Sequence, residues 1–300
     1  MNSRNLILVL ALVAVSAIRA APVDPVQQSE LAVANALFAA KNFSAARAAF
    51  EKILARAPDN PDANCVLGLF ACDDGDWEKA LRMEGIALAS DPNNARYQRC
   101  WGDANGIAAQ KAGVFSRLGY ARKCLAARQR AVELEPGNIE YRRDLLNFYV
   151  EAPGFAGGDR YKAYAQAGEI GKIDAEAGRQ AFAKIYVGEK KYALAFRLYD
   201  DALRESPDDY PALYSFGRLT LATGQRMEDG ITALRRCLEL TPPEGKDVPS
   251  RADVHCQLGN LWEKKNQPEQ ARAEYLAALK ERPDFRQAKQ ALKRLGSSKS

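Results

Sequence analysis

The chain has 300 residues, 47% of them hydrophobic and 27% charged, so it can fold as one or two globular domains or as one repeat array. Its 43 basic and 38 acidic residues are interspersed, and this near balance gives no indication of a nucleic-acid partner. Alanine is abundant, and runs of Val, Ile and Thr are nearly absent after the first 20 residues, which favours an all-α fold.

Residues 1–20 have the pattern of a secretory signal. Arg4 makes the start positive, residues 6–18 form an unbroken apolar or small run, and Ala20 precedes the expected cleavage point, with Ala17 and Ala21 as alternatives. The run is shorter than the roughly 20 residues that span a bilayer, and an uncleaved membrane anchor is the alternative interpretation. No cysteine follows the run, which argues against a lipid anchor.

We therefore predict an exported protein, periplasmic in a Gram-negative bacterium or secreted, with no stable membrane insertion after cleavage. Removing Arg4 and Arg19 leaves 41 basic and 38 acidic residues, a formal net charge of +3. Residues 21–26 are expected to form a short linker before the folded part.

One pattern of residues recurs through the rest of the chain. Segments 43–58, 76–92, 191–207 and 267–283 each carry a small residue, then a ring or long residue four positions later, and later a proline. A helix precedes each segment and places a large residue beside a small one, so that a neighbouring helix can approach closely. These doublets are Leu67-Gly68, Trp101-Gly102, Phe182-Ala183, Phe216-Gly217 and Leu258-Gly259.

The pattern resembles the tetratricopeptide repeat family, W-x2-L-G-x2-Y … A-x3-F-x2-A-x4-P over about 34 residues. The resemblance covers residues 27–285 and implies an all-α, right-handed α-solenoid of about seven helix pairs. The units are 27–60, 61–94, 95–138, 139–175, 176–209, 210–249 and 252–285. Residues 286–296 are expected to form a capping helix that covers the last unit, and 297–300 a disordered tail.

Three insertions interrupt the repeat, at 106–120, 150–160 and 242–250. The second, VEAPGFAGGDR, is rich in glycine, but neither phosphate-binding spacing fits it: residue 159 is Asp, and a helix rather than a strand precedes it. It is interpreted as a lengthened turn between two helices. Insertions of this kind either bind a partner or are simply tolerated, and both interpretations stay open.

Residues that carry out chemistry are scarce. His255 is the single histidine, which argues against a His-based metal site or a catalytic triad, and we expect it to pack in a helix. The six cysteines form no C-x-x-C pair. Cys65 and Cys100 lie on adjacent units and are the expected disulfide if the compartment is oxidising. We predict no enzyme activity, no cofactor and no metal.

The resemblance implies a scaffold that binds a protein or peptide in the concave groove of the first helices. Helical phase places seven residues on that face: Arg99, Asp103, Arg143, Asn147, Lys184, Arg218 and Asn260. Arg143 and Asn147 resemble one arm of the clamp by which some family members hold a peptide carboxylate, so an acidic or C-terminal segment is the expected partner. The match is partial, because arginine stands where lysine is usual and Ala177 and Ala181 stand where further basic residues are expected.

Three alternatives remain at this point. The seven residues could be an ordinary solvated helix face. The protein could be a structural subunit or assembly factor of an envelope complex that acts through its convex face or by self-association. An enzyme with a site in the insertions is the third, but the sequence offers no nucleophile–base pair for it. The sequence carries no signal for an oligomeric state.

Overall fold

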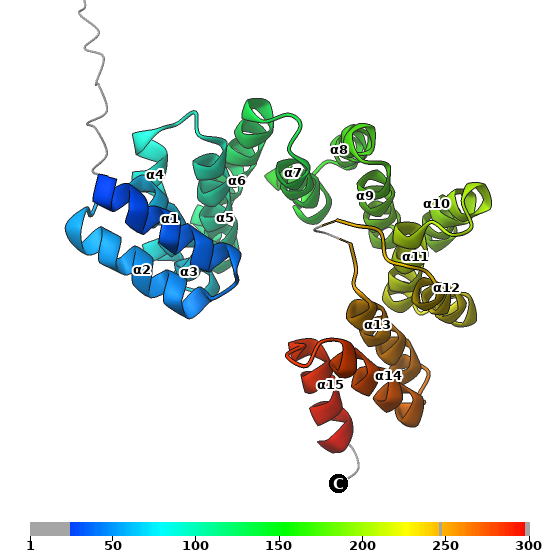
Figure 1. Ribbon diagram of the computed structural model, residues 1–300. Helices are drawn as coiled ribbons and strands as arrows, with labels where there is room; N and C mark the ends of the chain where they lie inside the picture. The colour runs from blue at the N-terminus through cyan, green and yellow to red at the C-terminus, as the bar shows by residue number, and fades with distance from the viewer. Residues whose placement is uncertain (1–24, 246–247, 298–300) are drawn as a thin grey trace, which may run out of the picture.

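The computed structural model describes residues 25–245 and 248–297, and the expected signal at 1–20 lies outside that part of the chain. Within these residues the regular structure consists of fifteen α-helices and one 3-10 turn, with no strand (Figure 1). The all-α prediction is therefore confirmed. None of the described helices is long and apolar enough to cross a membrane.

The helices form seven successive pairs. The first helices of the pairs are α1 (Pro25–Ala39), α3 (Pro61–Asp73), α5 (Ala95–Lys111), α7 (Ile139–Glu151), α9 (Ala175–Gly188), α11 (Tyr210–Thr223) and α13 (Arg251–Lys264). The second helices are α2 (Phe43–Arg56), α4 (Trp77–Ser90), α6 (Val114–Leu134), α8 (Arg160–Ile173), α10 (Tyr192–Glu205), α12 (Met227–Glu239) and α14 (Pro268–Glu281). The last helix, α15 (Arg286–Ser297), packs on α14 and buries Ala288, Ala291 and Leu295.

Short polar residues explain where many of the helices begin. Eight helices start directly after Asn or Asp, whose side-chain oxygen accepts a hydrogen bond from an amide of the first turn. Two of the tight turns between helices need a positive φ, and glycine supplies it at Gly75 (80°) and Gly224 (72°). The residues at each helix start and each turn thus determine where the helices begin and where the chain turns.

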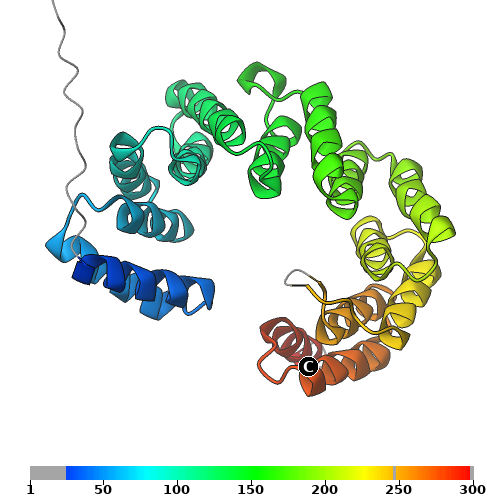
Figure 2. The ribbon, with the colours of Figure 1, turned by 45° about the horizontal axis from the view of Figure 1, so that its top comes forward.

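The pairs follow an arc (Figure 2), and the contacts between helices show which side is concave. At four of the six junctions between units the first helices pack against each other: α3 with α5, α7 with α9, and α11 with both α9 and α13. The second helices of neighbouring units make no such extensive contacts in the described part of the chain. First helices therefore line the inner surface of the arc. Residues 240–245, which follow α12, also lie inside the arc (Figure 2).

The core runs along the array between the two helices of each pair. Phe50, Tyr199 and Tyr275 are fully buried large side chains, and each lies at the repeat position that the sequence pattern gives to a ring. Because each unit buries its apolar face only against its neighbours, stability is distributed along the solenoid rather than held in one centre.

A disulfide bond links two neighbouring units. It joins Cys65 of α3 to Cys100 of α5, the pair expected from the sequence. The two cysteines are 0% and 2% exposed, so the bond lies inside the array. Cys72, Cys124, Cys237 and Cys256 remain as thiols.

Candidate functional site

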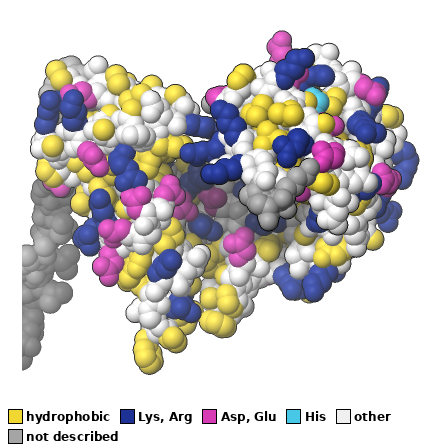
Figure 3. Space-filling view, turned by 90° about the horizontal axis from the view of Figure 1, so that it is seen from below, with side chains coloured by type: hydrophobic (Ala, Val, Ile, Leu, Met, Phe, Trp, Pro, Cys, Tyr) yellow, Lys and Arg dark blue, Asp and Glu magenta, His cyan; other side chains and the backbone are white. Residues whose placement is uncertain are grey.

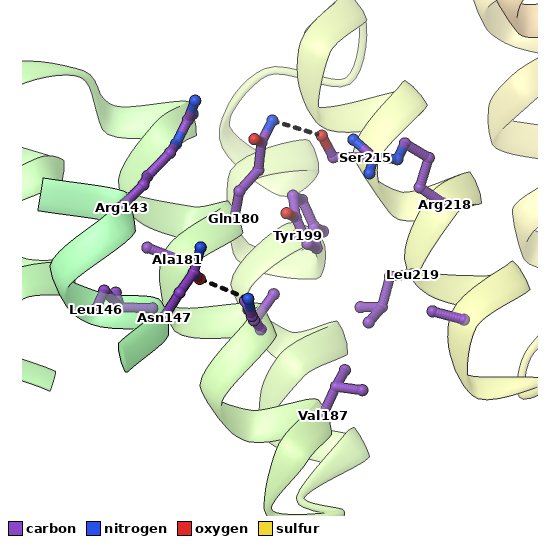
Figure 4. A pocket seen from close by; sticks show the side chains of 13 residues that line it. Arg143, Leu146, Asn147, Gln180, Ala181, Val187, Tyr199, Ser215, Arg218 and Leu219 are labelled. Carbon is purple, nitrogen blue, oxygen red and sulfur yellow. Dashed lines mark hydrogen bonds between the residues drawn. The ribbon is translucent and has the colours of Figure 1, made fainter. Parts of the chain in front are cut away.

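A cavity of about 440 Å³ opens on the concave side where α7, α9 and α11 meet (Figure 4). Each of these first helices contributes one basic residue to its lining: Arg143 from α7, Lys184 from α9 and Arg218 from α11. No Asp or Glu lines it among the residues that the structure describes. We call this feature the basic cavity. Figure 3 looks into the hollow of the array, where Lys and Arg side chains gather along the rim.

The basic residues differ in how they are held. Lys184 donates hydrogen bonds to Oδ1 of Asn147 and, at 3.1 Å, to Oε1 of Glu151, which holds its ammonium group between α7 and α9. Arg143 pairs with Glu140 one turn earlier at 2.8 Å. Arg218 is exposed and has neither an ion-pair nor a hydrogen-bond partner among the described residues. These exposed pairs are weak, so an incoming anion can replace the carboxylates.

The floor of the basic cavity is both polar and aromatic. Tyr199 reaches it from α10 and is 2% exposed, and burial raises the pKa of its phenol. Nε2 of Gln180 donates to the Ser215 hydroxyl at 3.3 Å, as Figure 4 shows, and that hydroxyl donates to Glu176. The cavity thus offers neutral hydrogen-bonding groups beneath a positively charged rim.

The structure separates the seven groove residues predicted from the sequence into two sets. Arg143, Asn147, Lys184 and Arg218 all line the basic cavity. Arg99, Asp103 and Asn260 do not line it.

Each residue of the second set is engaged by its neighbours. Nε of Arg99 lies 2.7 Å from Asp144 of the next unit. Asp103 pairs with Arg128 of its own unit at 3.4 Å. Asn260 accepts a hydrogen bond from the Tyr275 hydroxyl at 2.8 Å.

Sequence reasoning did not single out Gln180 or Ser215 as residues of the cavity. A signal for both existed, because Gln180 precedes Lys184 by four residues and Ser215 precedes Arg218 by three. Tyr199 gave no such signal, because it belongs to a second helix and its ring serves the core as well as the cavity floor. Ala181, where the family pattern suggested a basic residue, does line the cavity and leaves room in it.

A second cavity, of about 810 Å³, lies toward the N-terminal end of the array. Cys72 and Asp103 are among its lining residues, and Cys72 donates a weak hydrogen bond to Glu84, at 3.9 Å. Burial raises the pKa of the Cys72 thiol far above its ordinary value, so it stays protonated and a poor nucleophile. Burial also raises the pKa of Glu84, to about 9.

The described residues include no cluster of three or more His, Cys, Asp or Glu that could hold a metal ion. Nδ1 of His255 lies 2.7 Å from Oε2 of Glu274, and the side chain is mostly buried between α13 and α14. The histidine therefore connects the two helices of the last unit.

The glycine-rich loop of the fourth unit is closed upon itself. The amide of Gly157 donates to Gly154, that of Gly158 to Pro153 at 3.1 Å, and that of Asp159 to Tyr149 at 3.0 Å. Because these amides are all used within the loop, they are not available to cradle a phosphate. Gly157 has a φ of 104°, and a Cβ there would lie 2.7 Å from Leu125, so the glycines serve the shape and packing of the loop.

Comparison with known families agrees with the paired helices. Models described as "Tetratricopeptide repeat" match residues 37–99 and residues 252–285. The chain therefore contains tetratricopeptide repeats. The matched segments lie toward the two ends of the array, and all three insertions lie between them.

Solved structures share this fold at low sequence identity. A tetratricopeptide repeat protein from Parabacteroides merdae has a TM-score of 0.52 and 14% identity, and the alignment covers 90% of this chain and 98% of that one. A thermophilic TPR protein from Thermus thermophilus has a TM-score of 0.51 and 21% identity, covering 65% and 99%. No curated protein matches the sequence. These likenesses show the fold, and the two tetratricopeptide repeat models support a protein–protein interaction scaffold in general terms without naming a partner.

Proposed function

We propose that this tetratricopeptide-repeat protein is a non-catalytic scaffold whose basic cavity binds an acidic segment, or a C-terminal carboxylate, of a partner protein. The observation that carries the proposal is the convergence of Arg143, Lys184 and Arg218 from three successive first helices on one cavity without a lining carboxylate. Three like charges held around a hollow attract an anion and repel basic partners.

The fold keeps this arrangement in place before any partner arrives. Each of the three residues stands on a helix that a buried side chain anchors in the core: Leu146 in α7, Ile185 in α9 and Phe216 in α11. Lys184 is in addition held by Asn147. Since the backbone and part of the side-chain geometry are already ordered, binding loses little conformational entropy. Gln180 lies beside the charges, and its amide oxygen can accept a hydrogen bond from a peptide backbone.

The test is a titration with labelled peptides, followed by fluorescence anisotropy. The probes are a short Glu-rich peptide with a free C-terminus, its C-terminal amide, and a Lys-rich peptide of equal length. The account predicts binding of the Glu-rich peptide that weakens as salt rises, and none of the Lys-rich peptide. Weaker binding of the amide would assign part of the affinity to the terminal carboxylate. Equal binding of all three peptides would contradict the proposal.

We also propose that the protein acts outside the cytoplasm, in the cell envelope. Two observations support this location: the secretory pattern of residues 1–20 and the buried disulfide between Cys65 and Cys100, since disulfides persist in oxidising compartments. Intact-mass analysis of protein recovered from a cell-envelope extract tests it. The expected N-terminus lies at or near Ala21, and recovery of the uncleaved chain with six free thiols from the cytoplasm would contradict it.

A further inference from the structure

Two insertions that lie apart in the sequence meet on one surface of the third and fourth units. The start of α6 and the loop after α7 enclose a cavity of about 430 Å³, and Val114 from the first and Phe155 from the second both line it. α6 has 21 residues, whereas every other second helix has 13 or 14. The insertion therefore lengthens this helix by about two turns.

The outer rim of this surface is apolar and exposed. Val114 is 76% exposed, Phe115 103% and Phe155 80%, and we call these three residues the apolar crest. Phe115 does not line the cavity, and Phe155 stands at its edge with most of its ring exposed, so both rings project into solvent. A groove that receives a partner's side chains covers its aromatic walls, whereas rings that project are suited to entering another apolar phase.

The α5–α6 side of the crest is basic, and Glu151 is the one carboxylate among the residues that line the cavity. Residues 104–132 contain six Lys and Arg and no Asp or Glu, in a chain whose charges are otherwise interspersed. Arg122 lies seven residues after Phe115 on α6 and so shares its face of the helix, and Arg117 lines the same cavity as Val114 and Phe155. Lys111 precedes the crest, and its side chain is exposed and has no partner in the described part of the chain.

The N-terminus of α6 adds to the positive field at the crest. Gly113 caps this helix without a side-chain hydrogen bond, so amides of the first turn remain available at the surface. Exposed rings flanked by basic side chains, at the positive end of a helix, are the combination by which peripheral proteins bind anionic membranes.

We infer that the apolar crest docks this protein on the surface of a bilayer that contains anionic phospholipid. Phe115 and Phe155 enter the interfacial region, and Lys111, Arg117 and Arg122 lie at the level of the phosphate groups. This docking is peripheral and uses a different surface from the basic cavity. Experiments can therefore show a loss of membrane docking without a loss of peptide binding, or the reverse.

A tryptophan placed in the crest gives a local test. The variant Phe115→Trp in the full chain is mixed with vesicles of phosphatidylcholine alone or with phosphatidylglycerol added, and its emission is read as the difference from the wild type. A blue shift, with quenching by brominated lipid, is expected only with the anionic vesicles. If only residues 1–24 bound the vesicles, the emission wavelength of the introduced tryptophan would stay at the value it has without vesicles. That outcome overturns the inference.

Vesicle flotation of matched variants measures the contribution of each group. Phe115→Ser with Phe155→Ser is expected to lower the fraction bound to anionic vesicles about tenfold or more. The control, Ile173→Ser with Leu276→Ser, removes two exposed aliphatic side chains elsewhere and should leave binding unchanged. Equal loss in both double variants would overturn the inference.

A charge-reversal pair completes the design. Lys111→Glu with Arg122→Glu is expected to weaken binding by more than about fivefold per residue, whereas Lys289→Glu with Lys293→Glu on α15 should have little effect. Binding to neutral and anionic vesicles with equal affinity would overturn the inference. A shift of the Phe115→Trp emission by a soluble Glu-rich amphipathic peptide, but by neither kind of vesicle, would also overturn it and assign the surface to a protein partner.

Discussion

The ring of Tyr275 in α14 covers Gly259 in α13 so closely that a Cβ added at Gly259 would lie 2.5 Å from Cε1 of the ring. The same relationship recurs in the sixth unit, where a Cβ on Gly217 would lie 2.5 Å from Cγ of Leu234. The small residue of each doublet thus receives the large residue of the partner helix. The sequence spacing between the small residue of the first helix and the large residue of the second is therefore set by a physical contact. Substitution of the small residue tests this contact.

Replacing Gly259 with alanine should destabilise the last unit. A contact at 2.5 Å is shorter than real Cβ atoms make, so the ring or the helix must shift, at a cost of about 1–3 kcal/mol. Urea unfolding followed by circular dichroism measures the change. Gly168→Ala in α8 is the matched control, because nothing lies within 4 Å of its Cβ, and alanine should there be neutral or stabilising. Equal stabilities of the two variants would refute the assigned contact.

Glu84 makes the stability of the second unit depend on pH. It occupies the position of the large residue opposite Gly68, it is 0% exposed, and burial raises its pKa from 4.5 to about 9. The folded state therefore holds the proton that the unfolded state releases above pH 4.5. This contribution to stability is complete below pH 4.5 and is lost as the pH rises through about 9.

The variant Glu84→Gln removes this titration with little change of shape. Its free energy of unfolding should exceed that of the wild type by on the order of 2–3 kcal/mol at pH 7, and the difference should shrink toward pH 4.5. Urea unfolding at a series of pH values measures it, with Glu78→Gln at an exposed site of α4 as control. A difference that did not vary with pH would show that Glu84 is ionised in the folded protein.

The disulfide should be detectable by counting thiols. Under denaturing, non-reducing conditions four of the six cysteines should react with a thiol reagent, and all six after reduction. Because the bond closes a loop with a sequence separation of 35, Cys100→Ala should lower the free energy of unfolding by about 2–4 kcal/mol. Six reactive thiols without reductant would contradict the bond. Cys237→Ala, which removes a buried thiol outside the bond, controls for lost packing.

The array could be predicted from the sequence because its determinants are local and repeated. Caps such as Asn94 and Asp209, turns at glycine and the contact of a large side chain with the small residue of its partner helix each lie within one unit, so repeated copies reinforce the same interpretation. Arg143 and Lys184, which helical phase places on one face, both line the basic cavity, because phase fixes the face of a helix from which a side chain starts.

Phase does not fix where a long side chain ends. Arg99 starts on a first helix as predicted, but its guanidinium group forms an ion pair with Asp144 of the next unit, at 2.7 Å. Asn260 is likewise engaged by Tyr275 of its own unit. The contact between the two insertions could not be predicted either. It depends on how α6 and the loop after α7 lie in space, and the sequence spacing carries no information on that arrangement.

The most direct test of the central claim compares two double charge reversals in their binding of the Glu-rich peptide. Arg143→Glu with Lys184→Glu changes the basic cavity, and Lys52→Glu with Lys280→Glu makes the same change of net charge at exposed sites on α2 and α14. Helical content and melting temperature should stay close to those of the wild type in both. The account predicts that the first variant loses at least about tenfold in affinity and the second almost none. Undiminished binding by the first variant, or equal losses in both, would contradict a peptide site in the basic cavity.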